Sequence, residues 1–380
     1  MNLEISDTRT DYPETISYSV PHDVGNTAVA RWTPDGALFA VGASSDGTIA
    51  IIDTATKSIA HSLVGHVAPV TALCWWNTAA DDRSRLLVSA SRDWTCAVWR
   101  VCFDSIVKVS VIHFESPVLA ATTLENQHVT ISSPYQKTPL RFVAVCMNAA
   151  PVLVCLEETG SGGAYVQTLR TTLVDDGSTD SASTVAEFVQ TAAVATVNYR
   201  GSRALGFEAA KAARCLVFVG TVKGVVSVVD VETRQILSSF RPSGTAAIKG
   251  FQFSPNGEFL AVNSADKTLR CYHTANIMNN SSATAAPATS SSAKRIVTVI
   301  EPDYKFFDSI DQNRWITCAF SSPDAKYFIG GSSVKNVHKI YIWERETGAL
   351  AKFLELPKEM ASEAADSFEC IDKLAQCVDR

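Results

Sequence analysis

Four residues between positions 66 and 99 have side chains that could act together, on a substrate or on one another. They are His66, Ser89, Asp93 and Trp99. A carboxylate that orients an imidazole beside a hydroxyl is the arrangement of a hydrolytic triad. No nucleophile elbow surrounds Ser89, however, and the Trp99 indole N–H can complete the same chain of hydrogen bonds. We therefore expect a structural tetrad that satisfies buried polar groups and holds neighbouring strands together.

The segment that carries these residues has the pattern of short strands with hairpin spacing. A Gly-His pair leads into an apolar run, which is followed by a polar loop, a second run, a turn and a third run. In order these are Gly65-His66, Val70 to Trp76, Asn77 to Arg85, Leu86 to Ser91, Arg92-Asp93 and Cys96 to Trp99. The segment resembles a WD40 repeat, in which Val98-Trp99-Arg100 stands in the place of the Trp-Asp signature.

Similar units recur along the chain. A turn, an apolar strand, a small polar turn and another strand occur in residues 33–53, 254–273 and 322–343, and residues 215–230 fit the second half of this frame. Six units are expected near residues 26–65, 66–110, 111–157, 188–240, 245–275 and 312–356, of which the third is irregular because it lacks the Asp turn and the Trp. Such four-stranded units favour a β-propeller over a pair of β-sandwiches. We predict an all-β, WD40-type β-propeller of the seven-bladed family, with six clear blades and an incomplete or missing last blade.

The rest of the chain is assigned around this propeller. Residues 1–25 form a lead-in, in which Ile16 to Val20 could be a closing strand, and residues 26–356 form the propeller. Two insertions, 157–186 and 274–294, are rich in small polar residues and are expected to be mobile loops. Residues 357–380 have apolar side chains at helical spacing, which predicts a short amphipathic helix.

Composition excludes several classes of protein. The chain has 380 residues, 46% of them hydrophobic and 19% charged, and a net charge of −6. This balance is typical of a globular protein and argues against nucleic-acid binding by overall charge, although a local basic patch is allowed. No signal peptide and no apolar run of membrane-spanning length are found, so no membrane association is expected.

No motif indicates a cofactor, a metal or a small-molecule substrate. The 10 cysteines are scattered without a CxxC pair, so we expect reduced thiols in the cytosol or nucleus. Phosphate-loop and zinc-protease motifs are absent, and the histidines have no ligand spacing. The sequence therefore predicts a protein that is not an enzyme.

Several less regular stretches carry a more specific resemblance. They are MNLEI with Asp11-Tyr12-Pro13-Glu14, the pair Ser116-Pro117-Val118 and Ala150-Pro151-Val152, Thr245 to Lys249 before Asn263 to Asp266, and Asn313-Arg314-Trp315 before Tyr341 to Glu344. In this order they resemble the retinoblastoma-binding protein 5 family, the WD40 subunit of COMPASS and MLL-type complexes that methylate lysine 4 of histone H3.

The resemblance implies a non-catalytic nuclear scaffold. Its expected partners are a SET-domain methyltransferase, a SPRY-domain subunit, a WD-repeat subunit and the nucleosome. The acidic tail with which the family binds the SPRY-domain and WD-repeat subunits has no counterpart before residue 380.

The resemblance also implies contacts with nucleosomal DNA. Family members present a row of arginines from their late blades, and the matching positions here are Lys267, Arg314 and Lys335. A lysine keeps the charge that attracts a phosphate but loses the bidentate geometry of arginine. The alternative is that these are ordinary solvated cations in turns.

Two other functions are weighed against the scaffold. A WD40 substrate receptor of a ubiquitin ligase would carry a Trp-Asp-x-Arg blade end, which neither Val98 to Val101 nor Trp343-Glu344-Arg345 matches. A propeller enzyme would need acids or metal ligands gathered in the central channel, and the sequence places none there.

Overall fold

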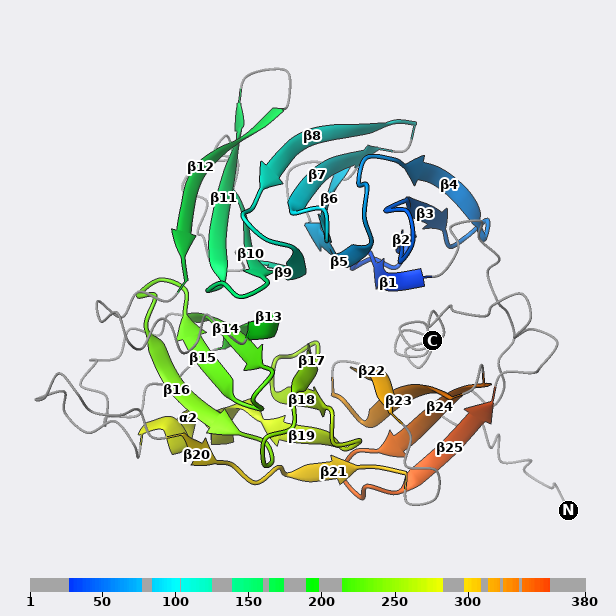
Figure 1. Cartoon of the computed structure of the whole chain (residues 1–380). Helices are drawn as coiled ribbons and strands as arrows, with labels where there is room; N and C mark the ends of the chain where they lie inside the picture. Colours follow the sequence, from blue (N-terminus) through cyan, green and yellow to red (C-terminus); the bar gives the residue numbers. More distant parts are fainter. Residues whose placement is uncertain are drawn as a thin grey trace, which may run out of the picture.

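The structure, a computed structural model, describes eleven parts of the chain. They are residues 27–76, 84–102, 104–124, 139–159, 164–173, 189–197, 214–282, 297–308, 314–321, 324–334 and 337–355. Within them the chain forms six sheets arranged radially around a centre, as Figure 1 shows. This architecture confirms the expected all-β propeller, and we number the sheets as blades one to six in chain order.

The first three blades each contain four antiparallel strands. Blade one comprises β1 (Thr27–Trp32), β2 (Leu38–Ala43), β3 (Ile49–Asp53) and β4 (Ser58–Leu63); blade two comprises β5 (Val70–Trp76), β6 (Ser84–Ser91), β7 (Thr95–Cys102) and β8 (Ile106–His113); blade three comprises β9 (Val118–Thr123), β10 (Leu140–Cys146), β11 (Val152–Thr159) and β12 (Ala164–Thr172).

The last three blades follow the same order, with two short strands added after a helix. Blade four comprises β13 (Val189–Val197), β14 (Arg214–Thr221), β15 (Val226–Asp230), β16 (Ile236–Arg241) and the parallel β20 (Thr298–Val299); blade five comprises β17 (Ile248–Phe253), β18 (Phe259–Ser264), β19 (Leu269–His273) and β21 (Tyr304–Phe306); blade six comprises β22 (Trp315–Phe320), β23 (Tyr327–Val334), β24 (Val337–Glu344) and β25 (Leu350–Glu355); the helix is α2 (Thr274–Ser282).

Both predicted insertions differ from the expectation. Residues 157–172 largely belong to β11 and β12, which complete blade three, instead of forming a loop. The polar composition misled the prediction because β12 is an outer strand in which only Tyr165 is buried, so it has little apolar alternation. In the second insertion α2 is helical, and Ile277 and Met278 pack into the core shared by blades four and five. Residues 1–26, 283–296 and 356–380, with the predicted closing strand and C-terminal helix, lie outside the described residues.

Each interface between consecutive blades has its own hydrophobic core. Five clusters join blades one and two, two and three, three and four, four and five, and five and six. The second strands are apolar on both sides, as in β18 (FLAVNS), because they lie between two neighbouring blades. Stability therefore depends mainly on contacts between neighbours, as in other repeat proteins.

The strand order gives the ring two different faces. Successive strands in a blade are antiparallel, so the connection from an outer strand to the next blade lies at the same end as the turn between second and third strands. We call this end the upper face and the opposite end the lower face. No helix in the described part of the chain is long and apolar enough to cross a membrane.

Candidate interaction face

The structure brings the four residues of the tetrad together at the upper face of blade two. His66 lies between β4 and β5, Asp93 lies in the β6–β7 turn, and Ser89 and Trp99 lie on β6 and β7. His66 Nδ1 is 2.8 Å from Asp93 Oδ2, and His66 Nε2 is 2.8 Å from Ser89 Oγ. The Trp99 indole N–H donates to Ser89 Oγ at 2.8 Å.

These bonds form a chain with one consistent direction. Because the Asp93 carboxylate can only accept, His66 Nδ1 carries the proton and its Nε2 accepts from the Ser89 hydroxyl. Ser89 is 0% exposed, and its oxygen also receives the Trp99 N–H. A substrate cannot reach this hydroxyl, so the arrangement connects a loop, a turn and two strands instead of presenting a nucleophile.

The Asp93 carboxylate organises the backbone around it. Burial raises the pKa of Asp93, but hydrogen bonds from Thr95 and His66 outweigh this effect and hold the pKa below its ordinary value. Thr95 Oγ1 donates to Asp93 Oδ1 at 2.6 Å, and the backbone N–H of Val67 donates to Oδ2 at 3.2 Å. The ionised carboxylate therefore fixes the β4–β5 connection against the β6–β7 turn.

The loop and the turn that Asp93 holds together carry exposed apolar side chains. Trp94, next to Asp93, has a φ of 68°. This left-handed backbone conformation is unfavourable for any residue that has a Cβ atom. Its side chain is 51% exposed, and Val67 and Val64 in the adjoining connection are 87% and 76% exposed. The upper face of blade two thus presents an aromatic ring and two aliphatic side chains to solvent.

In blade five a different set of residues connects the turn between the second and third strands to the loop that enters the blade. In the β18–β19 turn, Asp266 Oδ2 accepts from Arg270 Nη2 at 2.5 Å and from Ser243 Oγ, in the β16–β17 connection, at 2.7 Å. Arg270 Nη1 also donates to Ser264 Oγ at 2.8 Å. Burial raises the pKa of Asp266, but the bonds from Arg270 and Ser243 lower it to about 2.

This second network was not among the residues predicted from the sequence. Arg270 has a nearly buried side chain on a strand, so it appeared to be an ordinary position of β19. The available signal was the recurrence of an Asp turn two residues after a Ser, in Ser91-Arg92-Asp93 and again in Ser264-Ala265-Asp266.

Two of the three predicted DNA-contacting residues lie beside one another on the upper face. Lys267 follows Asp266 with a φ of 65°, and its carbonyl accepts the Trp315 indole N–H at 2.8 Å. Arg314, directly before Trp315, is exposed. The buried Trp315 ring therefore ties the Lys267 turn of blade five to the entry of blade six. The third residue, Lys335, lies outside the described residues.

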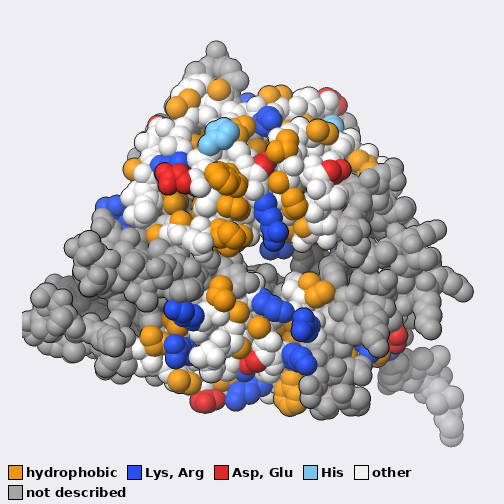
Figure 2. Space-filling view, in the orientation of Figure 1, with side chains coloured by type: hydrophobic (Ala, Val, Ile, Leu, Met, Phe, Trp, Pro, Cys, Tyr) orange, Lys and Arg blue, Asp and Glu red, His pale blue; other side chains and the backbone are white. Residues whose placement is uncertain are grey.

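Further cations, which the sequence analysis did not select, surround this pair. Lys223 lies in the β14–β15 turn and Lys249 near the start of β17, and both side chains are exposed. On the face seen in Figure 2, Lys and Arg side chains gather over the half that contains blades four to six, whereas hydrophobic side chains are more frequent over the other half. A sequence pattern that indicates this basic area is the recurrence of a lysine in the turn between the second and third strands, as at Lys223 and Lys267.

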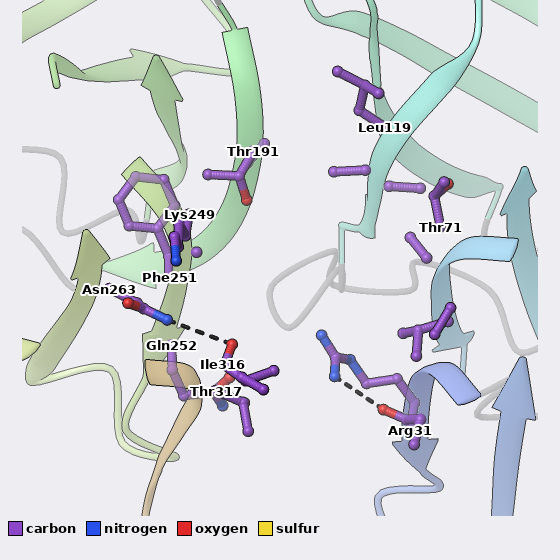
Figure 3. A pocket seen from close by; sticks show the side chains of 18 of the residues that line it. Arg31, Thr71, Leu119, Thr191, Lys249, Phe251, Gln252, Asn263, Ile316 and Thr317 are labelled. Atoms are coloured by element: carbon purple, nitrogen blue, oxygen red, sulfur yellow. Dashed lines mark hydrogen bonds between the residues drawn. The ribbon is translucent and has the colours of Figure 1, made fainter. Parts of the chain in front are cut away.

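The inner strands line a cavity of about 550 Å³ at the centre of the ring (Figure 3). Its lining comes mainly from β1, β5, β9, β13, β17 and β22 and contains Arg31 and Lys249 but no Asp or Glu. In the described part of the chain no group of three or more His, Cys, Asp or Glu residues could hold a metal ion. The eight cysteines there form no disulfide with one another.

Comparison with known proteins agrees with this fold. The WD40 family model (WD domain, G-beta repeat) matches residues 17–53, 57–100 and 234–273. The second match runs from the start of β4 to β7 and the third from β16 to β19, so a matched unit begins with the outer strand of the preceding blade.

Whole-chain likenesses extend further. The chain is 27% identical over 361 residues to the Set1 complex component swd1 of Schizosaccharomyces pombe, covering 94% of this chain and 75% of that protein. It is 27% identical to the retinoblastoma-binding protein 5 homolog of Drosophila melanogaster, covering 93% of this chain but only 59% of that protein. The crystal structure of the Myceliophteria thermophila Cps50 (Swd1) β-propeller domain superposes with a TM-score of 0.60 and 22% identity, covering 87% of each chain. The two sequence likenesses confirm the family resemblance, and the structural likeness confirms the propeller fold.

Proposed function

We propose that this protein is a non-catalytic WD40 scaffold subunit of a COMPASS-like histone H3 lysine-4 methyltransferase complex, working in the nucleus. In this role it bridges a SET-domain enzyme, a SPRY-domain subunit, a WD-repeat subunit and the nucleosome. The observation that carries the proposal is similarity over more than nine tenths of the chain to a protein described as a Set1 complex component.

The chemistry of the propeller supports a scaffold. The buried His-Ser-Asp arrangement of blade two is closed off by Trp99, and no carboxylate lines the described wall of the central cavity. What the upper face offers instead is an apolar area around Trp94 and a basic area around Lys267 and Arg314. An apolar area suits a protein subunit, and a basic area suits the phosphates of DNA.

The alternative, a ubiquitin-ligase substrate receptor, has less support. The arginines that follow Trp99 and Trp343 are engaged within the propeller. Arg100 donates to Glu158 at 3.1 Å, across the interface between blades two and three. Arg345 is 6% exposed, donates to the Ala325 carbonyl at 2.8 Å and lies 4.0 Å from the centre of the Phe259 ring. Both arginines therefore serve blade packing.

Purification of the tagged protein from its own cells tests the complex. We expect mass spectrometry to recover a SET-domain protein together with a SPRY-domain protein. Recovery of a cullin-type ligase in their place would contradict the proposal and favour the alternative.

Nucleosome binding tests the basic area. Exchanging Lys267 and Arg314 for Glu should weaken binding and reduce the slope of log affinity against log salt by about 1.8, since each lost phosphate contact removes roughly 0.9. The matched control is Lys57→Glu, because Lys57 also occupies a left-handed turn position, with a φ of 56°, but on the lower face. An unchanged slope in the Lys267/Arg314 variant, or an equal change in the Lys57 variant, would remove these residues from the interface.

A further inference from the structure

The central cavity has the volume of a ligand site. Its volume of about 550 Å³ lies within the range of small-molecule pockets, roughly 300–1,000 Å³. Small residues of the inner strands are among those that line it, including Ala30, Ala72, Ala120 and Gly250, and their small volume leaves the centre open. A DNA duplex is too wide to enter such a space, so an occupant must be small.

The charge of the described part of its wall has one sign. Figure 3 shows the Arg31 side chain, from β1, and the Lys249 side chain, from β17, on opposite sides of the cavity. No carboxylate is among the described residues that line it. Because the surrounding blades have a low dielectric constant, two cations that face one cavity from opposite walls create a positive potential that focuses on anions.

The remaining polar lining can donate hydrogen bonds to anionic oxygens. Thr27, Thr191 and Thr317 place hydroxyl groups around the wall, and Gln252 adds an amide. Arg31 Nη1 donates to the Ala30 carbonyl at 2.9 Å, which anchors the guanidinium beside its own strand. Hydroxyl, amide and guanidinium donors are the groups that recognise phosphate oxygens.

We propose that the central channel of this propeller binds a small polyanion that carries at least two phosphate groups, with Arg31 and Lys249 each holding one end. The separation of the two cations on opposite walls favours a molecule with spaced charges over a single inorganic phosphate. Inositol polyphosphates and nucleoside polyphosphates share this chemistry. The proposal stands independently of the scaffold function, because neither DNA nor a protein subunit takes part in it.

Isothermal titration calorimetry of the full chain at about 0.15 M ionic strength tests this site. The probes are inositol hexakisphosphate, ATP, pyrophosphate and inorganic phosphate, each titrated separately. We expect one of the first three to bind at least tenfold more tightly than inorganic phosphate, and the preferred probe identifies the source of the phosphates. Arg31→Gln and Lys249→Gln should each weaken that binding by about tenfold or more, as the loss of a charge-assisted hydrogen bond predicts.

Two control variants separate the channel from the rest of the surface. They are Lys57→Gln and Lys267→Gln. Lys57 lies on the lower face of blade one, the blade that carries Arg31, and Lys267 lies on the upper face outside the cavity lining. Both should retain the affinity within twofold, and circular dichroism of all variants verifies the fold. Absence of binding by every polyphosphate at millimolar concentration would overturn the proposal. So would loss of binding in the Lys267 variant with full binding in the Arg31 variant, since the anion would then occupy the outer face.

Discussion

Replacing Ser89 by Ala should destabilise the protein far more than the loss of one oxygen atom suggests. Ser89 Oγ is fully buried and lies 2.8 Å from both His66 Nε2 and Trp99 Nε1. Its removal leaves two buried polar groups without a partner, and each such group costs about 1–2 kcal/mol. We therefore expect the free energy of unfolding to fall by about 2–4 kcal/mol.

A double-mutant cycle with Trp99→Phe isolates the indole bond. Trp99→Phe removes the donor but leaves the Ser89–His66 bond in place, so the two single changes share one interaction. Their combined effect should be smaller than the sum by about 1 kcal/mol. Urea unfolding gives the free energies, and hydrogen exchange of the β6 and β7 amides locates the loss in blade two.

The control is Ser62→Ala in the exposed part of β4, which should change the stability by less than about 0.5 kcal/mol. A Ser89→Ala variant that matches this control would refute the reasoning, because the tetrad would then contribute nothing beyond an ordinary surface hydroxyl. Strict additivity with Trp99→Phe would refute the claim that the indole bond is part of the chain.

Three further perturbations probe other parts of the propeller. Because the pKa of Asp266 is held at about 2, below an unfolded value of about 3.9, its contribution to stability should be complete above about pH 5 and be lost as the pH falls through about 2. Asp266→Asn should remove this part of the acid sensitivity, so that its urea midpoints fall less steeply across that range than those of the unaltered protein. Gly220→Ala would place a Cβ 2.7 Å from Ile248 Cγ2 and should cost about 1–3 kcal/mol in thermal unfolding, whereas Gly250→Ala, with no atom within 4 Å, should cost less. Trp94→Gly should leave the melting temperature unchanged or raise it, since glycine accepts the φ of 68° without strain, and a clear fall would mean that the exposed ring contributes packing energy.

The repeated part of the fold could be predicted from the sequence because each blade repeats a strong local pattern. Turns with Pro and Gly, as at Pro34 and Gly36, and the apolar second strands gave the six blades near their observed positions. The tetrad could be selected because His66, Ser89, Asp93 and Trp99 have a fixed spacing within one unit. Patterns of this kind lie within one repeat unit, so they can be recognised without knowing which blades are neighbours.

The features that the sequence did not predict depend on contacts between residues distant in sequence, or on strands that are largely exposed to solvent. β12 has the polar composition of a loop because an outer strand needs only one buried side chain, Tyr165, to complete a sheet. β21 completes blade five after a helix and an intervening segment, and no local pattern connects Tyr304 to its partner Cys271. The basic lining of the channel was missed because Arg31 and Lys249 are 218 positions apart and meet only when the ring forms.

The two end blades have apolar flanks that face away from their described neighbours. In blade one, Phe39, Val41 and Ile52 form a cluster separate from the core shared with blade two, and each is at most 1% exposed. In blade six, Ile340 and Ile342 alternate with the aromatic residues that pack on blade five, and they are 4% and 0% exposed. Two such flanks are stable only when an apolar partner covers them.

A seventh sheet that includes the N-terminal segment is the partner we expect. The WD40 match at 17–53 begins ten positions before β1, and each equivalent match begins with an outer strand of the preceding blade. If Ile16 to Val20 form that outer strand, Tyr18 faces the blade and Ser17 faces solvent, since successive side chains alternate. Tyr18→Asp should then lower the free energy of unfolding by about 1–3 kcal/mol, through a buried charge at the edge of the core, and increase binding of a hydrophobic dye. Ser17→Asp should leave both unchanged, and equal behaviour of the two variants in urea unfolding would show that these residues do not close the ring.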